Sequence, residues 1–306
     1  MARILGLGDN VCDMYVHEKR MYPGGQALNV AVYSSMLGAQ SQYMGTFGTD
    51  DVAACVKTAL TEMDIPFPRA RCIAGTNGYA MVRLEDGDRV FIGSNRGGVA
   101  REQPLKLSRE DVEYIAGFDV VHTSNNSWID GELEKLDGIR TAVSYDFSGK
   151  WNEEERRNAI CPHIDYAFLS CGGLEPEQVR KVCDSMLHAG AHVVVATMGG
   201  KGAMYADAAG EMIQPPEWVE PVDTLGAGDS FAAALLTALA PIGKPPKAGV
   251  ERELLRQVGE NARREIYISW DASVANACRR YEVVLDNFRR GIYPPRDTRV
   301  DELLLD

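Results

Sequence analysis

The amino-acid sequence predicts an α/β fold, in which helices flank a largely parallel central sheet and a small β-structure projects from it. Short β-branched or aromatic runs alternate with stretches of helical length, as in consecutive βαβ units. The runs end in polar or small residues, which is typical of strands whose carboxyl ends border a binding site. One section, from about Arg69 to Gly98, departs from this rhythm and contains a hairpin signal.

The first part of the chain supplies two strand–helix pairs and then this hairpin. The apolar run Arg3 to Gly8 predicts a buried strand. A helix is expected between Gly24-Gly25, which precede it, and Gly38, which ends it. Asp50 or Asp51 lies near the N-cap of the second helix. The expected elements are a strand at Arg3–Gly8, a helix at Ala27–Leu37, a strand at Ser41–Gly45, a helix at Asp51–Met63, and hairpin strands at Tyr79–Leu84 and Arg89–Ile92 around an Asp-Gly turn.

The second part resumes the alternation of strands and helices. Expected strands are Asp119–Ser124, Thr141–Phe147, Asp165–Ser170 and His192–Thr197, with helices at Glu153–Ile160 and Glu177–Ala189. A second hairpin at Gly202–Ile213 and a helix rich in small residues at Gly226–Leu239 follow. Three prolines between Pro241 and Pro246 resemble a linker. The charged segment 247–306 beyond them is expected to be helical, with amphipathic stretches at Glu260–Arg264 and Ala275–Arg290.

Composition excludes several classes of protein. The chain has 306 residues, of which 45% are hydrophobic, and a formal net charge of −12. Binding to nucleic acid is therefore not expected, because such proteins usually carry a clustered basic face. Asp9 interrupts any signal-peptide core, and no stretch approaches the ~20 apolar residues of a membrane helix. Seven scattered cysteines without a Cys-x-x-Cys pair argue against a zinc site or disulfide framework, and predict buried thiols in a reducing cytoplasm.

The segment with the sharpest chemical signal joins a glycine-rich turn to a helix. Gly226, Ala227 and Gly228 open onto the helix, so that free backbone N–H groups can approach a phosphate. Asp229 follows in the first turn. An acid there can simply complement the helix dipole, but a carboxylate beside an anion-binding loop also suits phosphoryl transfer to an alcohol. The loop would hold the transferred charge while the carboxylate accepts the hydroxyl proton.

Three further segments are weaker candidates. Gly24 and Gly25 precede a helix that carries Asn29, whose amide can bind sugar hydroxyls, although an ordinary loop is as good an interpretation. Asp9 and Asp13 flank the end of the first strand and could bind vicinal hydroxyls or be solvated acids. The glycine-rich stretch from Thr197 suits a nucleotide-binding turn or a plain hairpin. No Gly-x-x-x-x-Gly-Lys-Ser/Thr loop and no Gly-x-Ser-x-Gly elbow is present.

The two glycine segments, in this order and about 200 residues apart, resemble the signatures of the ribokinase-like (PfkB-type) carbohydrate kinases. Residues 223–231, Asp-Thr-Leu-Gly-Ala-Gly-Asp-Ser-Phe, match the C-terminal signature throughout, and residues 24–29 match the N-terminal one. The likeness covers about residues 1–240. Within the family the chain is most similar to the fructoselysine 6-kinases, on stretches such as residues 8–13, 88–91, 146–151 and 162–168.

This resemblance implies a single ribokinase-like α/β domain over residues 1–306, with a discontinuous β-lid at about 11–22 and 71–98. It implies transfer of the γ-phosphoryl group of ATP, with Mg²⁺, to a sugar primary alcohol. Asp229 would be the base, with the amides of Gly226, Ala227 and Gly228 as the anion hole. The implied sugar ligands are Asp13, Gly25 and Asn29, and the implied nucleotide ligands are Thr197, Gly199 and Gly202. Beside them, Asp9 and Gly24 are expected to bind the sugar, and Gly200 and Thr224 the nucleotide.

One departure from the family pattern concerns the metal. Many members carry Asn-x-x-Glu after a central strand, whereas this chain has Ser170 in the place of the Asn and its acid is displaced. Glu175 or Glu177 is therefore expected to supply the missing acid, through water. Mg²⁺ keeps several waters and seldom needs a cage made of protein alone.

The resemblance favours fructoselysine, phosphorylated at its 6-hydroxyl, as the substrate. The amino-acid end would project toward the lid, where Tyr79, Arg89 and Arg96 are candidates to meet it. The alternatives are another kinase of this fold acting on a simple ketose, a ribose compound or a nucleoside, and a non-catalytic sugar-binding protein that kept the fold. The expected partner is thus a small sugar or Amadori-type molecule, with neither nucleic acid nor membrane, and a homodimer is left open.

Overall fold

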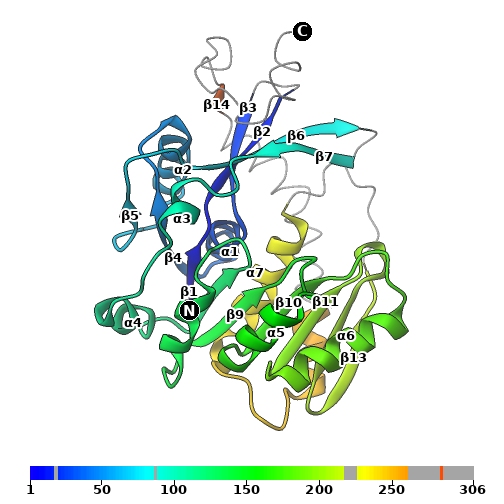
Figure 1. Ribbon diagram of the computed structural model, residues 1–306. Coiled ribbons are helices and arrows are strands. Elements are labelled where there is room, and N and C mark those ends of the chain that lie inside the picture. The colour runs from blue at the N-terminus through cyan, green and yellow to red at the C-terminus, as the bar shows by residue number, and fades with distance from the viewer. Residues whose placement is uncertain (17–19, 86–87, 217–225, 261–282, 285–306) are drawn as a thin grey trace.

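The computed structural model describes residues 1–16, 20–85, 88–216, 226–260 and 283–284. An α/β body and a small second sheet make up this part of the chain (Figure 1). The predicted fold class is confirmed.

The body is built on a nine-stranded sheet with the order β13-β12-β11-β10-β9-β8-β1-β4-β5. Every pairing from β5 to β11 is parallel, and β12 and β13 are antiparallel additions at one edge. The strands are β1 (Arg3–Gly8), β4 (Gln40–Phe47), β5 (Arg71–Cys72), β8 (Val120–Ser124), β9 (Ala142–Asp146), β10 (Tyr166–Ser170), β11 (Val193–Thr197), β12 (Ala203–Asp207) and β13 (Gly210–Gln214). Each predicted strand of the body is present, with ends shifted by at most two residues.

Helices cover both faces of this sheet, as its parallel strands require. They are α1 (Gln26–Met36), α2 (Asp51–Glu62), α3 (Val99–Glu102), α4 (Arg109–Ile115), α5 (Glu154–Ile160), α6 (Pro176–Ala189) and α7 (Ala227–Leu239). Short 3-10 turns lie at Asp130–Leu136, Cys161–His163, Gly199–Lys201 and Ala240–Ile242. Alternate strand residues enter two separate cores. Leu5 and Val121 pack with residues of α6, whereas Ile4 and Val120 pack with residues of α7.

Helix α1 lies unusually close to the central strand β1, because the strand offers it a glycine. A Cβ at Gly6 would lie 2.1 Å from the carbonyl oxygen of Ala27 and 3.0 Å from the Cβ of Ala31. Such contacts do not occur in folded proteins, so any larger residue at position 6 would push α1 outward. On its other side α1 packs against α7. The first turns of α1 and α7 are thereby fixed relative to β1.

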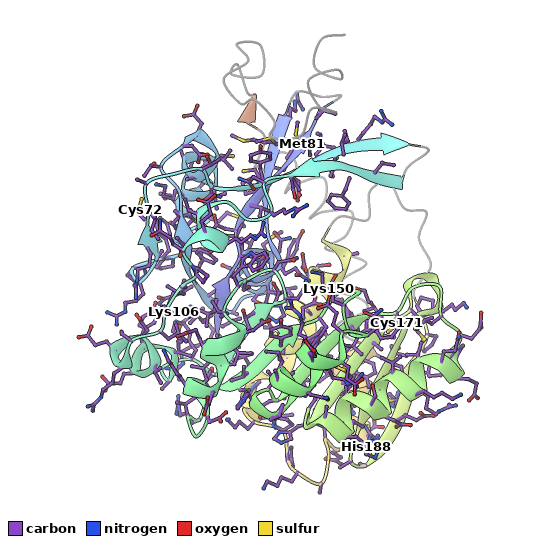
Figure 2. All side chains as sticks on the ribbon, viewed as in Figure 1. Cys72, Met81, Lys106, Lys150, Cys171 and His188 are labelled. Carbon is purple, nitrogen blue, oxygen red and sulfur yellow. The ribbon has the colours of Figure 1, made fainter. Side chains whose placement is uncertain are left out.

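A second, smaller sheet with the order β14-β3-β2-β6-β7 contains most of the segments expected to form the β-lid, and it is called the lid below. Arg71 and Cys72, which were also expected in the lid, form β5 of the body sheet instead. That this sheet closes over a ligand stays a prediction. Its strands are β2 (Val11–Tyr15), β3 (Arg20–Gly24), β6 (Gly78–Glu85), β7 (Asp88–Ser94) and β14 (Val283–Val284). Strands β6 and β7 form the hairpin that the Asp-Gly turn predicts. Figure 2 shows the labelled Met81 in this sheet and Lys150, which follows β9, on the side of the body that faces it.

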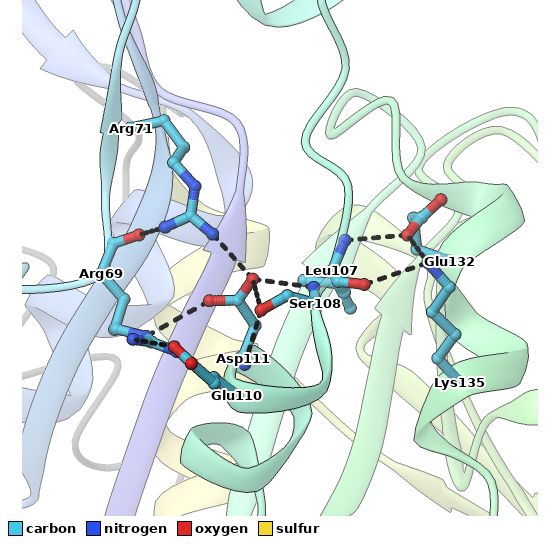
Figure 3. Close-up of polar contacts among 8 residues, drawn as sticks. All are labelled: Arg69, Arg71, Leu107, Ser108, Glu110, Asp111, Glu132 and Lys135. Atoms are coloured by element: carbon cyan, nitrogen blue, oxygen red, sulfur yellow. Dashed lines mark hydrogen bonds and ion pairs between the residues drawn. The ribbon is translucent and has the colours of Figure 1, made fainter.

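Helix α4 was missed in the sequence, although a capping box begins it. The Ser108 side chain accepts a hydrogen bond from the N–H of Asp111, whose carboxylate accepts one from the N–H of Ser108. Asp111 is fully buried, and Arg69 and Arg71 pair with it at 3.2 Å and 2.7 Å (Figure 3). Each buried charge here has a partner, so the cluster in Figure 3 ties α4 to the segment before β5 and is structural.

The C-terminal segment was predicted to be helical throughout, and the structure tests only parts of it. Residues 252–260 are helical, as expected, whereas residues 247–251 form a turn and irregular chain, so the prediction is wrong there. Val283 and Val284 form the short strand β14 beside β3, so the predicted helix at Ala275–Arg290 is wrong at these two residues. The rest of that stretch, with 261–264, lies outside the described residues. No helix in the described ranges is long and apolar enough to cross a membrane. Among the described cysteines, five are buried free thiols and Cys72 is exposed.

Candidate active site

Four carboxylates gather where β1 and β9 end, beside the lid and the start of α7. Asp9 follows β1, Asp13 lies in the lid strand β2, Asp146 ends β9, and Asp229 lies in the first turn of α7. They act on one another electrostatically, since the negative charges of Asp146, Asp9 and Asp13 all raise the pKa of Asp229. The structure thus brings together three acids that the sequence singled out and adds a fourth.

Asp229 is held by a hydrogen bond that joins the two glycine segments. The side-chain amide of Asn29 in α1 donates to a carboxylate oxygen of Asp229 at 2.7 Å. The two residues are 200 positions apart in sequence and meet because α1 packs against α7. The resemblance gave one of them to the sugar and the other to the proton transfer. Their contact brings the residues of the two expected roles together.

The start of α7 has the shape that an anion site needs. Gly226 is the N-cap with φ of 74°, and a Cβ there would lie 2.6 Å from the hydroxyl oxygen of Tyr33. Only glycine fits both the conformation and the space. Gly226 provides no side-chain cap, and the first N–H groups of a helix have no acceptor within it. The amides of Ala227 and Gly228 lie where they could donate to an anionic ligand, which the helix dipole also favours.

The environment of Asp229 raises the affinity of its carboxylate for a proton. Burial raises the pKa of this carboxyl, the hydrogen bond from Asn29 lowers it, and the three neighbouring acids raise it, with a result of about 8. A carboxyl with such a pKa binds a proton far more readily than an ordinary aspartate. This property suits a group that accepts a proton from an alcohol as the alcohol oxygen attacks.

Asp146 is the acid that sequence reasoning missed as a site residue. It is 6% exposed, and its carboxylate accepts a hydrogen bond of 2.6 Å from the N–H of Ser148. Burial raises its pKa, hydrogen bonds from Ser148 and Gln26 lower it, and the charge of Asp9 raises it, to about 6. The sequence does contain a signal for Asp146, because it is the last residue of a buried strand, and Asp9 directly follows one. Residues 146–151 served above only as a mark of the subfamily.

The paired glycines before α1 are required by the two acids near them. A Cβ at Gly24 would lie 2.7 Å from a carboxylate oxygen of Asp13. Gly25 has φ of 112°, and a Cβ there would lie 2.9 Å from the carbonyl oxygen of Asp9. The pair thus makes room for Asp13 and for the turn at Asp9. Whether the backbone of Gly24 and Gly25 also contacts a sugar stays a prediction.

The remaining candidates for the substrate lie on the lid. Arg96 is exposed, with φ of 56°, in the loop after β7. Arg89 lies in β7 opposite Leu84, but its side chain is outside the described part of the structure. Tyr79 is 7% exposed and packs with Cys12 and Met81. Tyr79 pairs with Cys12, so the two side chains lie on the same face of the lid sheet. Asp13 is the next residue after Cys12, and its side chain therefore points to the opposite face. Tyr79 thus points away from Asp13.

The glycine-rich stretch after β11 forms a tight turn into β12. Gly202 has φ of 93°, and a Cβ there would lie 2.1 Å from the carbonyl oxygen of Gln214, so the hairpin itself requires this glycine. Gly199 and Gly200 meet no such obstacle. The hydroxyl of Thr197 donates to the carbonyl oxygen of Leu169. A nucleotide-binding role for these residues stays a prediction, and Thr224 lies outside the described residues.

The two acids proposed for the metal are exposed and already paired. Glu175 is the N-cap of α6 and lies 2.8 Å from the ammonium of Lys201. Glu177 lies 2.9 Å from Arg180. Within the described ranges no three His, Cys, Asp or Glu residues converge as a metal site would need. These donors do not make a protein-only Mg²⁺ site, and a metal near them would keep waters or phosphate oxygens as further ligands.

Comparison with known proteins gives this geometry a context. The family model described as pfkB family carbohydrate kinase matches residues 5–252. The chain is 39% identical over 239 residues to fructosamine kinase FrlD of Bacillus subtilis (strain 168), covering 77% of this chain and 83% of the relative. It is 33% identical over 236 residues to fructoselysine 6-kinase of Escherichia coli (strain K12), covering 77% and 88%.

Among solved structures, the fold is similar to that of Arabidopsis thaliana ribokinase complexed with ribose and ATP. The TM-score is 0.67 at 18% sequence identity, over 86% of this chain and 92% of the ribokinase. At this identity the likeness shows a shared fold.

Proposed function

The chain belongs to the pfkB family of carbohydrate kinases, and we propose that it transfers the γ-phosphoryl group of ATP to the 6-hydroxyl of fructoselysine. The observation that carries the proposal is the contact of Asn29 with Asp229 at the open start of α7. This contact joins a polar ligand for a sugar, a proton acceptor and an anion site. The choice of fructoselysine rests on the relatives named for fructosamine and fructoselysine, at 39% and 33% identity.

The reaction needs a base, and Asp229 is suited to that role. As the 6-oxygen bonds to the γ-phosphorus, its proton passes to the Asp229 carboxylate, and the bond between the γ-phosphorus and the β,γ-bridging oxygen breaks to release ADP. The amides of Ala227 and Gly228 would donate to the oxygens of the transferred group. Asn29 orients Asp229 through its amide N–H, and its carbonyl oxygen can accept from a sugar hydroxyl.

The nucleotide and its metal should lie at the carboxyl ends of the neighbouring strands β9, β10 and β11. We expect Thr197, Gly199, Gly200 and Gly202 to border the nucleotide, since they follow β11 at the edge of the sheet where β9 and β10 also end. Mg²⁺ would neutralise phosphate charge when it is bound. The described part of the chain forms no protein-only site for it.

The metal assignment gives one prediction. If Glu175 or Glu177 holds Mg²⁺ through water, then Glu175→Gln or Glu177→Gln should raise the Mg²⁺ concentration needed for half-maximal rate at least ~3-fold. The measurement is the initial rate of ADP release across a Mg²⁺ titration at constant free ATP. Glu154→Gln, in the first turn of α5, is a matched control with another exposed, paired glutamate. An unchanged requirement in both variants would remove these residues from the metal site.

The acid cluster predicts a shift in the pH profile. The base form of Asp229 is needed, so kcat/KM for the sugar should rise with pH through the free-enzyme pKa of about 8. Asp146→Asn removes a negative neighbour and should lower that pKa, which moves the rise to lower pH by roughly 0.5–1 unit. Asp165→Asn is the control, because Asp165 is a buried acid directly before β10, at the amino ends of the strands and not at the carboxyl ends. A midpoint that stays put in Asp146→Asn would refute the coupling.

The function itself is tested with a panel of phosphoryl acceptors. Fructoselysine, fructose, ribose and adenosine are supplied with ATP under one set of conditions, ADP release is followed, and the product is examined by phosphorus NMR. A 6-phosphate formed preferentially from fructoselysine supports the proposal. Preference for fructose, ribose or adenosine would leave a kinase with a different substrate, and release of no ADP with any sugar would overturn the proposed reaction.

A further inference from the structure

The Asp9 carboxylate accepts hydrogen bonds from four donors on two other segments. The backbone N–H groups of Gln26 and Ala27, at the start of α1, donate to it at 2.7 Å and 3.1 Å. The hydroxyls of Ser124 and Ser127, at the end of β8 and in the turn after it, each donate at 2.9 Å. Asp9 is only 5% exposed. Three of these donors share Oδ1, whereas the N–H of Gln26 alone donates to Oδ2. The four donors together match the roughly four acceptor positions of a carboxylate, and burial leaves Asp9 little surface for a sugar hydroxyl.

The turn that carries Asp9 fits closely against Ser127. The N–H of Asp9 donates to the Ser127 hydroxyl at 3.2 Å, so this serine bonds both the backbone and the side chain of Asp9. Gly8 has φ of 132°, and a Cβ there would lie 2.1 Å from the Ser127 hydroxyl oxygen. The end of β1, the start of α1 and the turn after β8 therefore form one interlocked unit.

Asp9 also takes the place of the missing cap of α1. The N-cap residue Gly25 has no side chain, and the first turn of α1 contains no acid. A carboxylate from another segment thus satisfies two of the orphan N–H groups and complements the positive end of the helix dipole. One turn further along, the same helix carries Asn29, which holds Asp229 at 2.7 Å.

We propose that Asp9 is a positioning residue: together with Ser124 and Ser127 it fixes the start of α1, so that Asn29 holds Asp229 in place for proton transfer. In this role Asp9 does not contact the sugar. The inference rests on the proposed kinase reaction for its readout, but its evidence is the hydrogen-bond network alone. It replaces the expectation that Asp9, as an acid at the end of the first strand, binds the substrate.

The test compares Asp9→Asn with Ser127→Ala. An asparagine side chain at this position cannot accept from two backbone N–H groups and two hydroxyls at once, because one of its two terminal atoms is a donor. A small displacement of reacting groups can cost ~100-fold in rate, so we expect kcat to fall ~10- to 100-fold in Asp9→Asn, with KM for the sugar changed less than ~3-fold. Ser127→Ala is the milder variant, expected to lower kcat ~3- to 10-fold by the same path.

The pH profile separates positioning from general destabilisation. Asp9→Asn removes a negative charge near Asp229, so the rise of kcat/KM should move to lower pH, whereas Ser127→Ala should leave its midpoint unchanged. Asp165→Asn, a buried acid that accepts from the N–H of Val143, controls for the loss of a buried carboxylate and should change neither kcat nor the midpoint.

Two kinetic results would overturn the proposal. The first is a KM for the sugar raised 10-fold or more in Asp9→Asn with kcat unchanged at saturation, which would mean that Asp9 binds the sugar directly. The second is an unchanged kcat in both Asp9→Asn and Ser127→Ala. If the unmodified protein phosphorylates no sugar, the proposed function has failed. The hydrogen-bond network is then tested by amide hydrogen exchange, which Asp9→Asn should speed up at the first amides of α1, and unchanged exchange there would overturn the proposal.

Discussion

Asp229→Asn should lower kcat by ~10²–10⁴, the usual contribution of a general base, while the affinity for nucleotide stays nearly the same. The substitution keeps the shape and removes the basic oxygen. Because the carboxyl has a pKa of about 8, it is a stronger base than an ordinary aspartate, and its loss should cost more than the loss of a solvated acid. The measurement is kcat from initial rates of ADP release, with ATP affinity from a separate binding titration.

The control for this variant is Asp51→Asn. Asp51 lies in the first turn of α2, as Asp229 lies in the first turn of α7, but it is exposed. If Asp229 served only to complement a helix dipole, the two variants would have similar small effects of less than ~1 kcal/mol on stability. Turnover at the unmodified rate in Asp229→Asn would refute its assignment as the base.

The fold was largely predictable because local patterns and tertiary environment agree in its body. Strand β1 has the bounds that the run Arg3 to Gly8 predicts, and Asp50 caps α2 by accepting from the N–H of Ala53. Helix α4 is seven residues long and has little periodicity, so only its capping box could have revealed it. Strand β14 pairs with β3 from more than 250 residues away, a contact that no local pattern encodes.

The sequence named three of the four acids that meet at the candidate site, but it did not reveal their contacts. Asp229 and Asn29 were both named from sequence, yet nothing in the sequence says that they touch. Asp9 looked like a ligand because it is an acid after a strand, and the four donors around it come from segments 17 to 118 residues away. Asp146 ends β9 in a similar position but was not identified as a site residue, because its burial beside Asp9 is visible only in the fold. Burial and hydrogen-bond saturation decide whether an acid binds, positions or titrates, and both are tertiary properties.

Strand register in the lid shows which residue could meet the amino-acid half of fructoselysine. Asp13 pairs with Ala80, and two residues further along Tyr15 pairs with Val82, which in turn pairs with Phe91 in β7. Paired residues share a face of a sheet, so Phe91 lies on the face that carries Asp13. It is 63% exposed. Its distance from Asp13, two strands across and two residues along, is roughly 12 Å, which suits the far end of an extended substrate.

We therefore expect fructoselysine to be phosphorylated with a kcat/KM ~10- to 150-fold above that of free fructose. One charge-assisted contact of the substrate carboxylate, with Arg89 or Arg96 as the candidate partner, is worth ~1.5–3 kcal/mol, and 1.36 kcal/mol is tenfold in rate. Packing of the lysyl methylenes on Phe91 adds apolar contact. Phe91→Ala should then reduce kcat/KM for fructoselysine ~3- to 10-fold and leave that for fructose unchanged.

Val90→Ala is the matched control for the lid, since Val90 neighbours Phe91 in β7, is 36% exposed and points to the opposite face. It should affect neither substrate. Equal losses for fructoselysine and fructose in Phe91→Ala would mean that the ring supports the lid and does not select the substrate. If fructose or a nucleoside matches fructoselysine in the unmodified protein, the substrate assignment fails, whereas the kinase reaction at Asp229 stands. The two outcomes are distinct because fructose lacks the amino-acid half and shares the 6-hydroxyl.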